Sequence, residues 1–193
     1  FFKDKKNLFQ DDSDEFRLSQ TARYFIGGLL DHACAIAAIA NPTLNSYKRL
    51  IPNFEAPIYV AWGMHNRSSL IRIPARKNVD VELRNPDPAA NPYLAMAVMF
   101  KAGLDGLKNE IEPDEQVTDN IFDMNKEIRE QKGINTLPSD IMESIAELKK
   151  DEVIKGILGK HVYDHFIKAK EIEWELYRKQ VHQWELDRYL NNF

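Results

Sequence analysis

Hydrophobic and polar positions change their spacing along the chain, and the first pattern predicts a helix. Residues 19–40 are mostly apolar at helical spacing; Ser19 is a suitable N-cap, and Asn41-Pro42 ends the run. The longest apolar stretch within it, residues 25–40, is interrupted by Asp31-His32 and falls short of the roughly 20 apolar residues that a membrane span needs. The sequence therefore predicts a buried core helix. Gly27-Gly28 and the neighbouring alanines indicate that another element packs very close to it.

A strand pattern follows a proline-rich loop at residues 41–57. Residues 58–62 and 69–73 are short runs rich in β-branched and aromatic residues. Residues 79–84 alternate strictly, so the predicted strand has two different faces. The apolar face and the charged face are formed by Val79, Val81 and Leu83, and by Asp80, Glu82 and Arg84, respectively.

Helical spacing returns in the second half of the chain. Asn91-Pro92 opens a predicted helix that runs to about residue 109, because proline suits the first turn of a helix. Two shorter helices are expected at 138–150 and 151–158, followed by one long amphipathic helix at 159–190. Loops are expected at 1–17 and 110–137. Together these elements predict an α+β fold, with a small antiparallel sheet packed with several helices, in one domain over residues 1–193.

Composition narrows the classes of function. Hydrophobic residues make up 44% of the chain, which is enough for a packed core, and the net charge of −4 comes without any basic stripe. We therefore expect neither a nucleic-acid nor a membrane partner. Cys34 is the only cysteine, so we expect a small buried hydrophobe and a reducing cytoplasm. The chain begins Phe1-Phe2-Lys3 without a signal-peptide pattern, and we expect it to belong to a longer protein.

Four arginines in the first half of the chain are candidate anion binders: Arg49, Arg67, Arg72 and Arg84. Arginine presents a planar fork of donors that matches carboxylate and phosphate groups. Arg67 and Arg72 are five residues apart, so on one regular strand they would face opposite sides. Both reach one ligand only if Arg67 lies in the turn before the strand. The alternative for each arginine is an ordinary solvated or structural side chain.

Two glutamates are the candidate carboxylates. Glu55 lies in a loop stiffened by prolines, where a carboxylate on a flap can bind ammonium or accept its proton. Glu82 shares its predicted strand face with Arg84, and carboxylate oxygens are what a hard divalent cation prefers. The alternatives are an exposed loop glutamate and a solvent-facing strand with paired charges. The residues alone thus indicate an anion and metal site on a small sheet.

The remaining histidines and tryptophans favour structural roles. His161 and His165 are four residues apart on a predicted helix, but no third ligand accompanies them, so we expect surface histidines. His32, inside an apolar helix, is expected to be a satisfied buried or interfacial residue. Trp174 and Trp184 are expected to pack in a core or at an interface.

Several phrases of the sequence, spread over nearly the whole chain, resemble one family. They are LSQTARYFIGGLLDHACAIAAIANPTLNSYKRLIPNFEAP, NRSSLIRIP, ELRNPDPAANPYLAMA and AGLDGLKNEI. These phrases are similar to the C-terminal part of the catalytic domain of bacterial and archaeal type I glutamine synthetases. The resemblance implies ligation of ammonia to the γ-carboxylate of glutamate through γ-glutamyl phosphate. It also implies ATP as co-substrate, Mg²⁺ or Mn²⁺ as cofactor, a cytoplasmic location and a homododecamer in the full-length protein.

The resemblance further implies a role for each candidate residue. Glu55 resembles the flap glutamate that takes a proton from ammonium, and Glu82 resembles a ligand of the metal that bridges the nucleotide phosphates. The arginines would hold anions: Arg49 the α-carboxylate of glutamate, Arg67 and Arg72 the transferred phosphate of ATP, and Arg84 both substrate glutamate and the phosphoryl group. Such a set suits phosphoryl transfer, in which positioning and charge neutralisation do most of the catalysis.

The sequence departs from the family in three respects. It begins after the family's His-containing metal and nucleotide motif, so we expect this chain alone to be inactive, since one metal carboxylate cannot hold the ions. Asp80 stands where many members have a nucleotide-contacting arginine, and Arg76 and Lys77 are the candidates to replace it. Phe122 stands where some members have a tyrosine that is adenylylated; phenylalanine has no hydroxyl, so this regulation is not expected.

Two alternative functions stay open. A related ligase that joins glutamate to another amine, such as a polyamine, would use the same arginines, although Glu55, suited to a small cation, favours ammonia. A catalytically inactive family member or an isolated structural module is the second alternative. The intact set of arginines and glutamates argues against that loss of activity.

Overall fold

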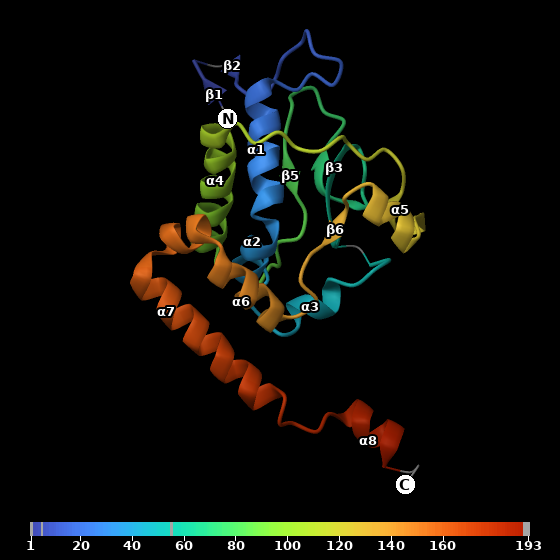
Figure 1. Cartoon of the computed structure of the whole chain (residues 1–193), viewed down its shortest axis with the longest axis vertical. Coiled ribbons are helices and arrows are strands. Elements are labelled where there is room, and N and C mark those ends of the chain that lie inside the picture. The colour runs from blue at the N-terminus through green and yellow to red at the C-terminus, as the bar shows by residue number, and fades with distance from the viewer. Residues whose placement is uncertain (1, 5, 55, 191–193) are drawn as a thin grey trace.

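The computed structural model describes residues 2–4, 6–54 and 56–190, and its helices lie beside a small sheet (Figure 1). The helices are α1 (Gln20–Asp31), α2 (Ala33–Ala40), α3 (Ser46–Arg49), α4 (Pro92–Asn109), α5 (Lys126–Gln131), α6 (Ile141–Lys150), α7 (Glu152–Tyr177) and α8 (Gln183–Tyr189), with a 3-10 turn η1 (Ile121–Asp123). The strands are β1 (Phe2–Lys3), β2 (Lys6–Asn7), β3 (Tyr59–Met64), β4 (Ser69–Ile73), β5 (Glu82–Leu83) and β6 (Asn135–Thr136). The predicted α+β class is confirmed.

The main sheet has the strand order β5-β4-β3-β6 and is mixed. The strands β3 and β4 pair in parallel, with Tyr59 opposite Ser69 and Met64 opposite Ile73, whereas β4–β5 and β3–β6 are antiparallel. The prediction of a wholly antiparallel sheet is therefore wrong for this central pair. The reason is that residues 65–68 return the chain to the beginning of β3 before β4 starts. This reversal begins at His65, which adopts a left-handed φ of 58°.

The apolar stretch at residues 19–40 forms the core, but as two helices. Ser19 caps α1 as predicted, because its hydroxyl accepts a hydrogen bond from the backbone N–H of Ala22. The helix then breaks at His32, and α1 and α2 are bent by 71° relative to each other. Every residue of α2 except Cys34 is buried. Among the described residues no single helix is long and apolar enough to cross a membrane; the bent pair α1–α2 meets that test by length and composition only.

The predicted close approach to the Gly27-Gly28 pair is confirmed. A methyl group at Gly28 would collide with the carbonyl of Ala102 and with the backbone of Gly106 on α4, and one at Gly27 would collide with the carbonyl of Ile111. The helices α1 and α4 therefore touch through their backbones, and Figure 1 shows them side by side. Asn91 caps α4 and Pro92 begins it, as the sequence predicts.

Two stretches differ from their predicted structure. Only residues 82 and 83 of the predicted strand 79–84 join the sheet ladder, because the Val79 carbonyl instead accepts a hydrogen bond from the Asn7 side chain at 2.8 Å. The predicted loop at 110–137 contains η1, α5 and β6, which are short elements that hydrophobic periodicity does not reveal.

The C-terminal helical region is also divided. Gly159, with φ 68° and ψ 156°, puts a bend inside α7, at the predicted boundary between two helices. The predicted helix at 159–190 ends at Tyr177, and α8 follows after a short break. In Figure 1 the second part of α7 and α8 extend away from the remaining helices and the sheet.

Candidate functional site

Two of the predicted site residues face each other across neighbouring strands. Arg72 on β4 and Glu82 on β5 are register partners, and Arg72 Nε lies 2.6 Å from Glu82 Oε2. The Arg72 side chain is 19% exposed and that of Glu82 is 40% exposed. Antiparallel pairing thus places a cation and a carboxylate together on one face, with the carboxylate still open to solvent.

Arg84 lies directly after β5 and joins this pair. Its backbone N–H donates to the Leu70 carbonyl at 3.0 Å, and its Nη1 donates to the carbonyls of Arg67 and Ser69. Burial lowers the pKa of Arg84 below its ordinary value and Arg72 lowers it further, while Glu82 acts in the opposite direction. Because arginine stays charged in proteins, these guanidinium groups repel one another, and a bound anion would relieve that repulsion.

Arg67 lies in the turn before β4. This is the position it needs if Arg67 and Arg72 are to bind the same ligand. Asn66 holds this turn: its side-chain oxygen accepts from the N–H and hydroxyl of Ser68, and its amide donates to the carbonyls of Val117 and Asp119. Arg67 itself is exposed. The turn is therefore firmly held while the Arg67 side chain is available to a ligand.

Arg49 is the last residue of α3 and reaches the segment that follows β5. Its Nη2 donates to the carbonyl of Asn85 and to the side-chain oxygen of Asn41, and its Nε lies 3.8 Å from Asp87 Oδ2. Sequence reasoning did not single out these three partners, which lie in the loop motifs NPT and NPDP. Arg49 is thus connected to the residue next to Arg84.

The candidate carboxylates are less completely placed. Glu55 lies outside the described residues, so its expected position on a flap stays a prediction. Among the described residues no group of three or more His, Cys, Asp or Glu side chains is arranged to hold a metal ion. Glu82 can therefore supply one carboxylate oxygen to a cation, and the other ligands must come from elsewhere. Arg76 Nη1 lies 3.2 Å from Asp80 Oδ2. Arg76, a candidate to replace the family's nucleotide-contacting arginine, is therefore beside the position where that arginine would stand.

The residues for which structural roles were expected behave in different ways. His161 and His165 are exposed, with ring centroids 4.2 Å apart, and His32 is buried and hydrogen-bonded, as predicted. Trp174 packs against the core, as predicted. Trp184 is 63% exposed, so the prediction that it packs in a core is wrong within this chain, and its place at an interface stays a prediction.

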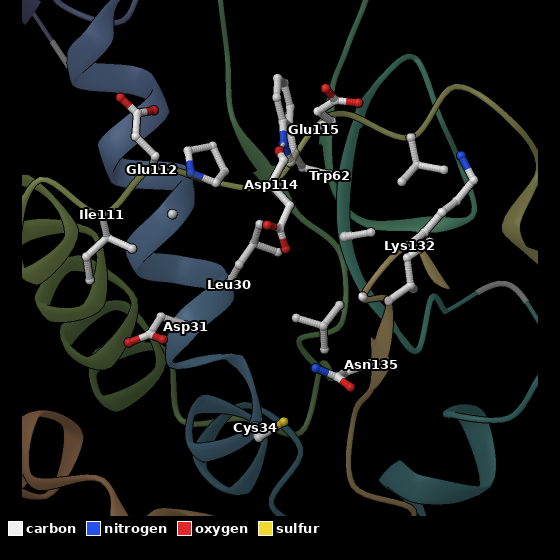
Figure 2. Close-up of a pocket in the computed structure, with 17 residues that line it drawn as sticks. Leu30, Asp31, Cys34, Trp62, Ile111, Glu112, Asp114, Glu115, Lys132 and Asn135 are labelled. Atoms are coloured by element: carbon white, nitrogen blue, oxygen red, sulfur yellow. Dashed lines mark hydrogen bonds between the residues drawn. The ribbon is translucent and has the colours of Figure 1, made fainter. Parts of the chain in front are cut away.

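Cys34 is half-buried rather than fully buried, because it faces a cavity. Burial raises the pKa of its thiol. This cavity of about 300 Å³ lies between α1, β3 and residues 111–117. Figure 2 shows Leu30 and Asp31 on its helical side and Trp62 and Asp114 among the residues across from them.

The cavity contains none of the predicted site residues. Its carboxylates are Asp31, Glu112, Asp114 and Glu115, so its charge is opposite to that of the arginine cluster. No signal in the sequence pointed to the cavity, because residues 110–137 have the composition of an ordinary acidic surface loop.

The geometry defines a class of protein before any comparison. At the β4–β5 edge Arg72 pairs with Glu82 and Arg84 donates to the Arg67 carbonyl, while Arg49 bonds the carbonyl of Asn85, the residue after Arg84. Guanidinium groups bind phosphate and carboxylate through paired hydrogen bonds, and a neighbouring carboxylate can bind a cation that accompanies a phosphate. This arrangement on an α+β scaffold has the chemistry to bind anionic ligands.

Comparison with known proteins identifies the family. The family model for "Glutamine synthetase, catalytic domain" matches residues 1–189, so the chain belongs to the glutamine synthetase catalytic-domain family. It is 52% identical to the glutamine synthetase of Methanosarcina mazei over 98% of this chain and 43% of the relative. It is 51% identical to that of Thermus thermophilus over 100% of this chain and 44% of the relative. The chain thus spans less than half the length of these curated relatives.

Solved structures give the same result for the fold. A structure described as "Apo GmaS without ligand" matches with a TM-score of 0.79 and 38% identity, over 96% of this chain and 41% of that one. A second structure, "GmaS/ADP complex-Conformation 1", matches with a TM-score of 0.81 and 37% identity, over 96% of this chain and 43% of that one.

Proposed function

We propose that this chain supplies the substrate- and phosphate-binding arginines of a glutamine synthetase, which ligates ammonia to the γ-carboxylate of glutamate with ATP. The observation that carries the proposal is the Arg72–Glu82 pair, with Arg84 beside it. The family membership supports the reaction, and the similarity to an ADP complex of GmaS supports nucleotide use.

Each residue has a chemical role in this reaction. Arg67, Arg72 and Arg84 neutralise the charge that spreads over the transferred phosphoryl group, which is the main requirement in phosphoryl transfer. Arg49 holds the α-carboxylate of glutamate. Glu82 supplies one oxygen to a divalent cation, which when bound neutralises phosphate charge.

Glu55 remains, by the same resemblance, the proposed acceptor of the ammonium proton. Deprotonation is needed because ammonium has no lone pair, so only ammonia can attack the γ-glutamyl phosphate. The Glu55 carboxylate accepts that proton, and inorganic phosphate leaves the γ-carbonyl carbon as the new C–N bond forms.

The arrangement of the whole protein belongs to the same proposal. We propose that this chain is the C-terminal part of the catalytic domain, that it is inactive alone, and that the full-length protein is a cytoplasmic homododecamer using Mg²⁺ or Mn²⁺. The chain spans only 43% and 44% of two curated relatives, which supports its being a part that is inactive alone. The described residues contain no group of three side chains that could hold a metal ion, which also supports inactivity alone.

The choice of amine tests this proposal against its nearest alternative. In the full-length protein with ATP, glutamate and Mg²⁺ or Mn²⁺, we expect amide formation with ammonium to exceed that with larger amines such as polyamines. A preference for a larger amine would instead indicate a related γ-glutamyl–amine ligase. A folded, ATP-binding protein without activity on any amine would favour a structural family member.

A further inference from the structure

The Arg49 guanidinium is held by three residues from two separate parts of the chain. Its Nη2 donates to the side-chain oxygen of Asn41, at 3.3 Å, and to the carbonyl of Asn85, while its Nε faces Asp87 Oδ2 at 3.8 Å. Asn41 follows α2, Arg49 ends α3, and Asn85 and Asp87 follow β5. One side chain thus connects the end of a core helix to the end of a sheet strand.

The groups that hold Arg49 are themselves fixed by the backbone. The N–H of Asn41 donates to the Ala37 carbonyl at 2.8 Å, and that of Asp87 donates to the Ala40 carbonyl at 2.8 Å. The other carboxylate oxygen of Asp87 accepts from the N–H of Ala89 at 2.7 Å. The Asp87 side chain is therefore fixed independently of Arg49, whereas the Asn41 side chain is placed by its anchored backbone and by its hydrogen bond with Arg49 itself.

Burial separates an inner from an outer edge of the guanidinium. Asn41 is 0% exposed and Asn85 is 1% exposed, and the Arg49 Nε atom is buried as well. The Arg49 side chain is nevertheless 30% exposed. No described residue accepts a hydrogen bond from its Nη1. Nη2 is thus hydrogen-bonded to the protein and Nε is buried near Asp87 without a hydrogen bond, which leaves the Nη1 edge for a ligand.

We infer that Asn41 and Asp87 are positioning residues that aim Arg49 at the α-carboxylate of the amino-acid substrate. This inference rests on the proposed function. A free arginine side chain has several rotatable bonds, and ordering it on binding would weaken affinity. Asn41 and Asp87 order it beforehand, so their effect is directed to the carboxylate ligand rather than to the nucleotide.

Kinetics of the full-length protein test this inference with paired variants. Asp87→Asn removes the charge and keeps the shape, and Asn41→Leu removes the acceptor at similar volume. We expect each to raise the KM for glutamate about ten-fold, because Arg49 loses either its hydrogen bond to Asn41 or the neighbouring charge of Asp87. The KM for ATP should change less than about two-fold. Asn41→Asp retains the acceptor oxygen and should stay near the unmodified protein.

Asp12→Asn is the matched control, because Asp12 also pairs with an arginine, Arg17, at 3.0 Å, but on an exposed loop. It should leave both KM values unchanged. Equal changes in the two KM values for the Asp87 variant, or none, would overturn the inference. If Asn41→Leu fails to fold, Asp87→Asn decides alone.

A second measurement separates failure of this inference from failure of the proposed function. Nuclear magnetic resonance of the chain reports whether the two Nη groups of Arg49 rotate slowly, as in a held guanidinium, and whether Asp87→Asn makes them average. Slow rotation in a protein without any ligase activity would contradict the proposed function and the role of Arg49 toward glutamate. It would still show that Asn41 and Asp87 hold Arg49 in place. Rotation in the unmodified chain as fast as that of exposed arginines would overturn the inference itself.

Discussion

The ring of His32 lies between carboxylates from different helices, with its Nδ1 2.6 Å from Asp151 Oδ2. Its Nε2 lies 3.3 Å from Asp105 Oδ2 on α4 and 3.8 Å from Asp31 Oδ2 on α1. Asp151 caps the beginning of α7, and His32 sits at the break between α1 and α2. This one buried imidazole therefore connects four helices of the core.

The environment of His32 predicts a pH-dependent stability. Burial disfavours the charged ring, but the hydrogen bond and charge of Asp151, with Asp105 and Asp31, outweigh it and raise the pKa of His32 above 6.5. A raised pKa in the folded state means that this stabilisation is complete below about pH 6.5. It is lost as the pH rises through the folded-state pKa. We expect the free energy of unfolding, measured with urea, to fall as the pH rises above 6.5 through that folded-state value.

The variant His32→Gln isolates this contribution. At pH 6 we expect it to lower the free energy of unfolding by about 2–4 kcal/mol, because buried carboxylates lose their charged partner. Its stability should also change less between pH 6 and pH 9 than that of the unmodified chain. Parallel pH profiles for the two proteins would contradict the assigned role, since groups such as Cys34 titrate in both.

The pKa of Asp151 predicts the opposite behaviour at acidic pH. Its burial raises the pKa, but the hydrogen bond from His32 and those from the N–H groups of Ile154 and Val153 lower it overall. The stabilisation is therefore present above about pH 3.9 and lost as the pH falls through the folded-state value. Asp151→Asn should flatten the acidic limb of the stability profile measured by urea unfolding. An unchanged acidic limb would show that Asp151 contributes no pH dependence.

Glycine substitutions test the contact between α1 and α4. Gly28→Ala places a methyl group against the α4 backbone, which cannot move aside as a flexible side chain can, so we expect a loss of about 3 kcal/mol in unfolding free energy. Gly156→Ala on α7 is the control, because nothing lies within 4 Å of its added methyl. That change should stabilise the chain by about 0.5–1 kcal/mol. Equal effects of the two substitutions would contradict the backbone contact.

The sequence predicted well those elements that carry long-range periodicity or a specific cap. Ser19 and Asn91 mark real helix beginnings, and Gly27-Gly28 marks a real backbone contact. The break at His32 was not predicted, because the apolar residues resume directly after the Asp31-His32 interruption and read as one helix. The carboxylates that hold His32 at this break come from α4 and from the beginning of α7, which are distant in the sequence.

The candidate site was predictable in part for a similar reason. The strand alternation placed Glu82 and Arg84 on one face, and the spacing required Arg67 to lie in a turn if it shares a ligand with Arg72. The parallel pairing of β3 with β4 was not predictable from the pattern, since such a pair normally needs a long crossover connection. The partners of Arg49 were missed because Asn85 contributes its backbone carbonyl, which has no sequence signal.

A double-mutant cycle on Arg72 and Glu82 separates stability from function. Because Glu82 is 40% exposed, solvent screens the pair. We expect a coupling of only about 0.5–1 kcal/mol between Arg72→Met and Glu82→Gln in urea unfolding. Each single change should nevertheless reduce ligase activity of the full-length protein about a hundred-fold or more. A large coupling in stability with full activity would make this pair structural.

Glutamine formation by the full-length protein tests the central claim most directly. The assay compares the unmodified protein with Glu82→Ala in ATP, glutamate, ammonium and Mg²⁺ or Mn²⁺, with circular dichroism to confirm that both are folded. We predict glutamine from the unmodified protein and a loss of about a hundred-fold or more in the variant, because the cation loses a ligand. Equal activity of the two proteins, or no glutamine from a folded protein that binds ATP, would contradict the account.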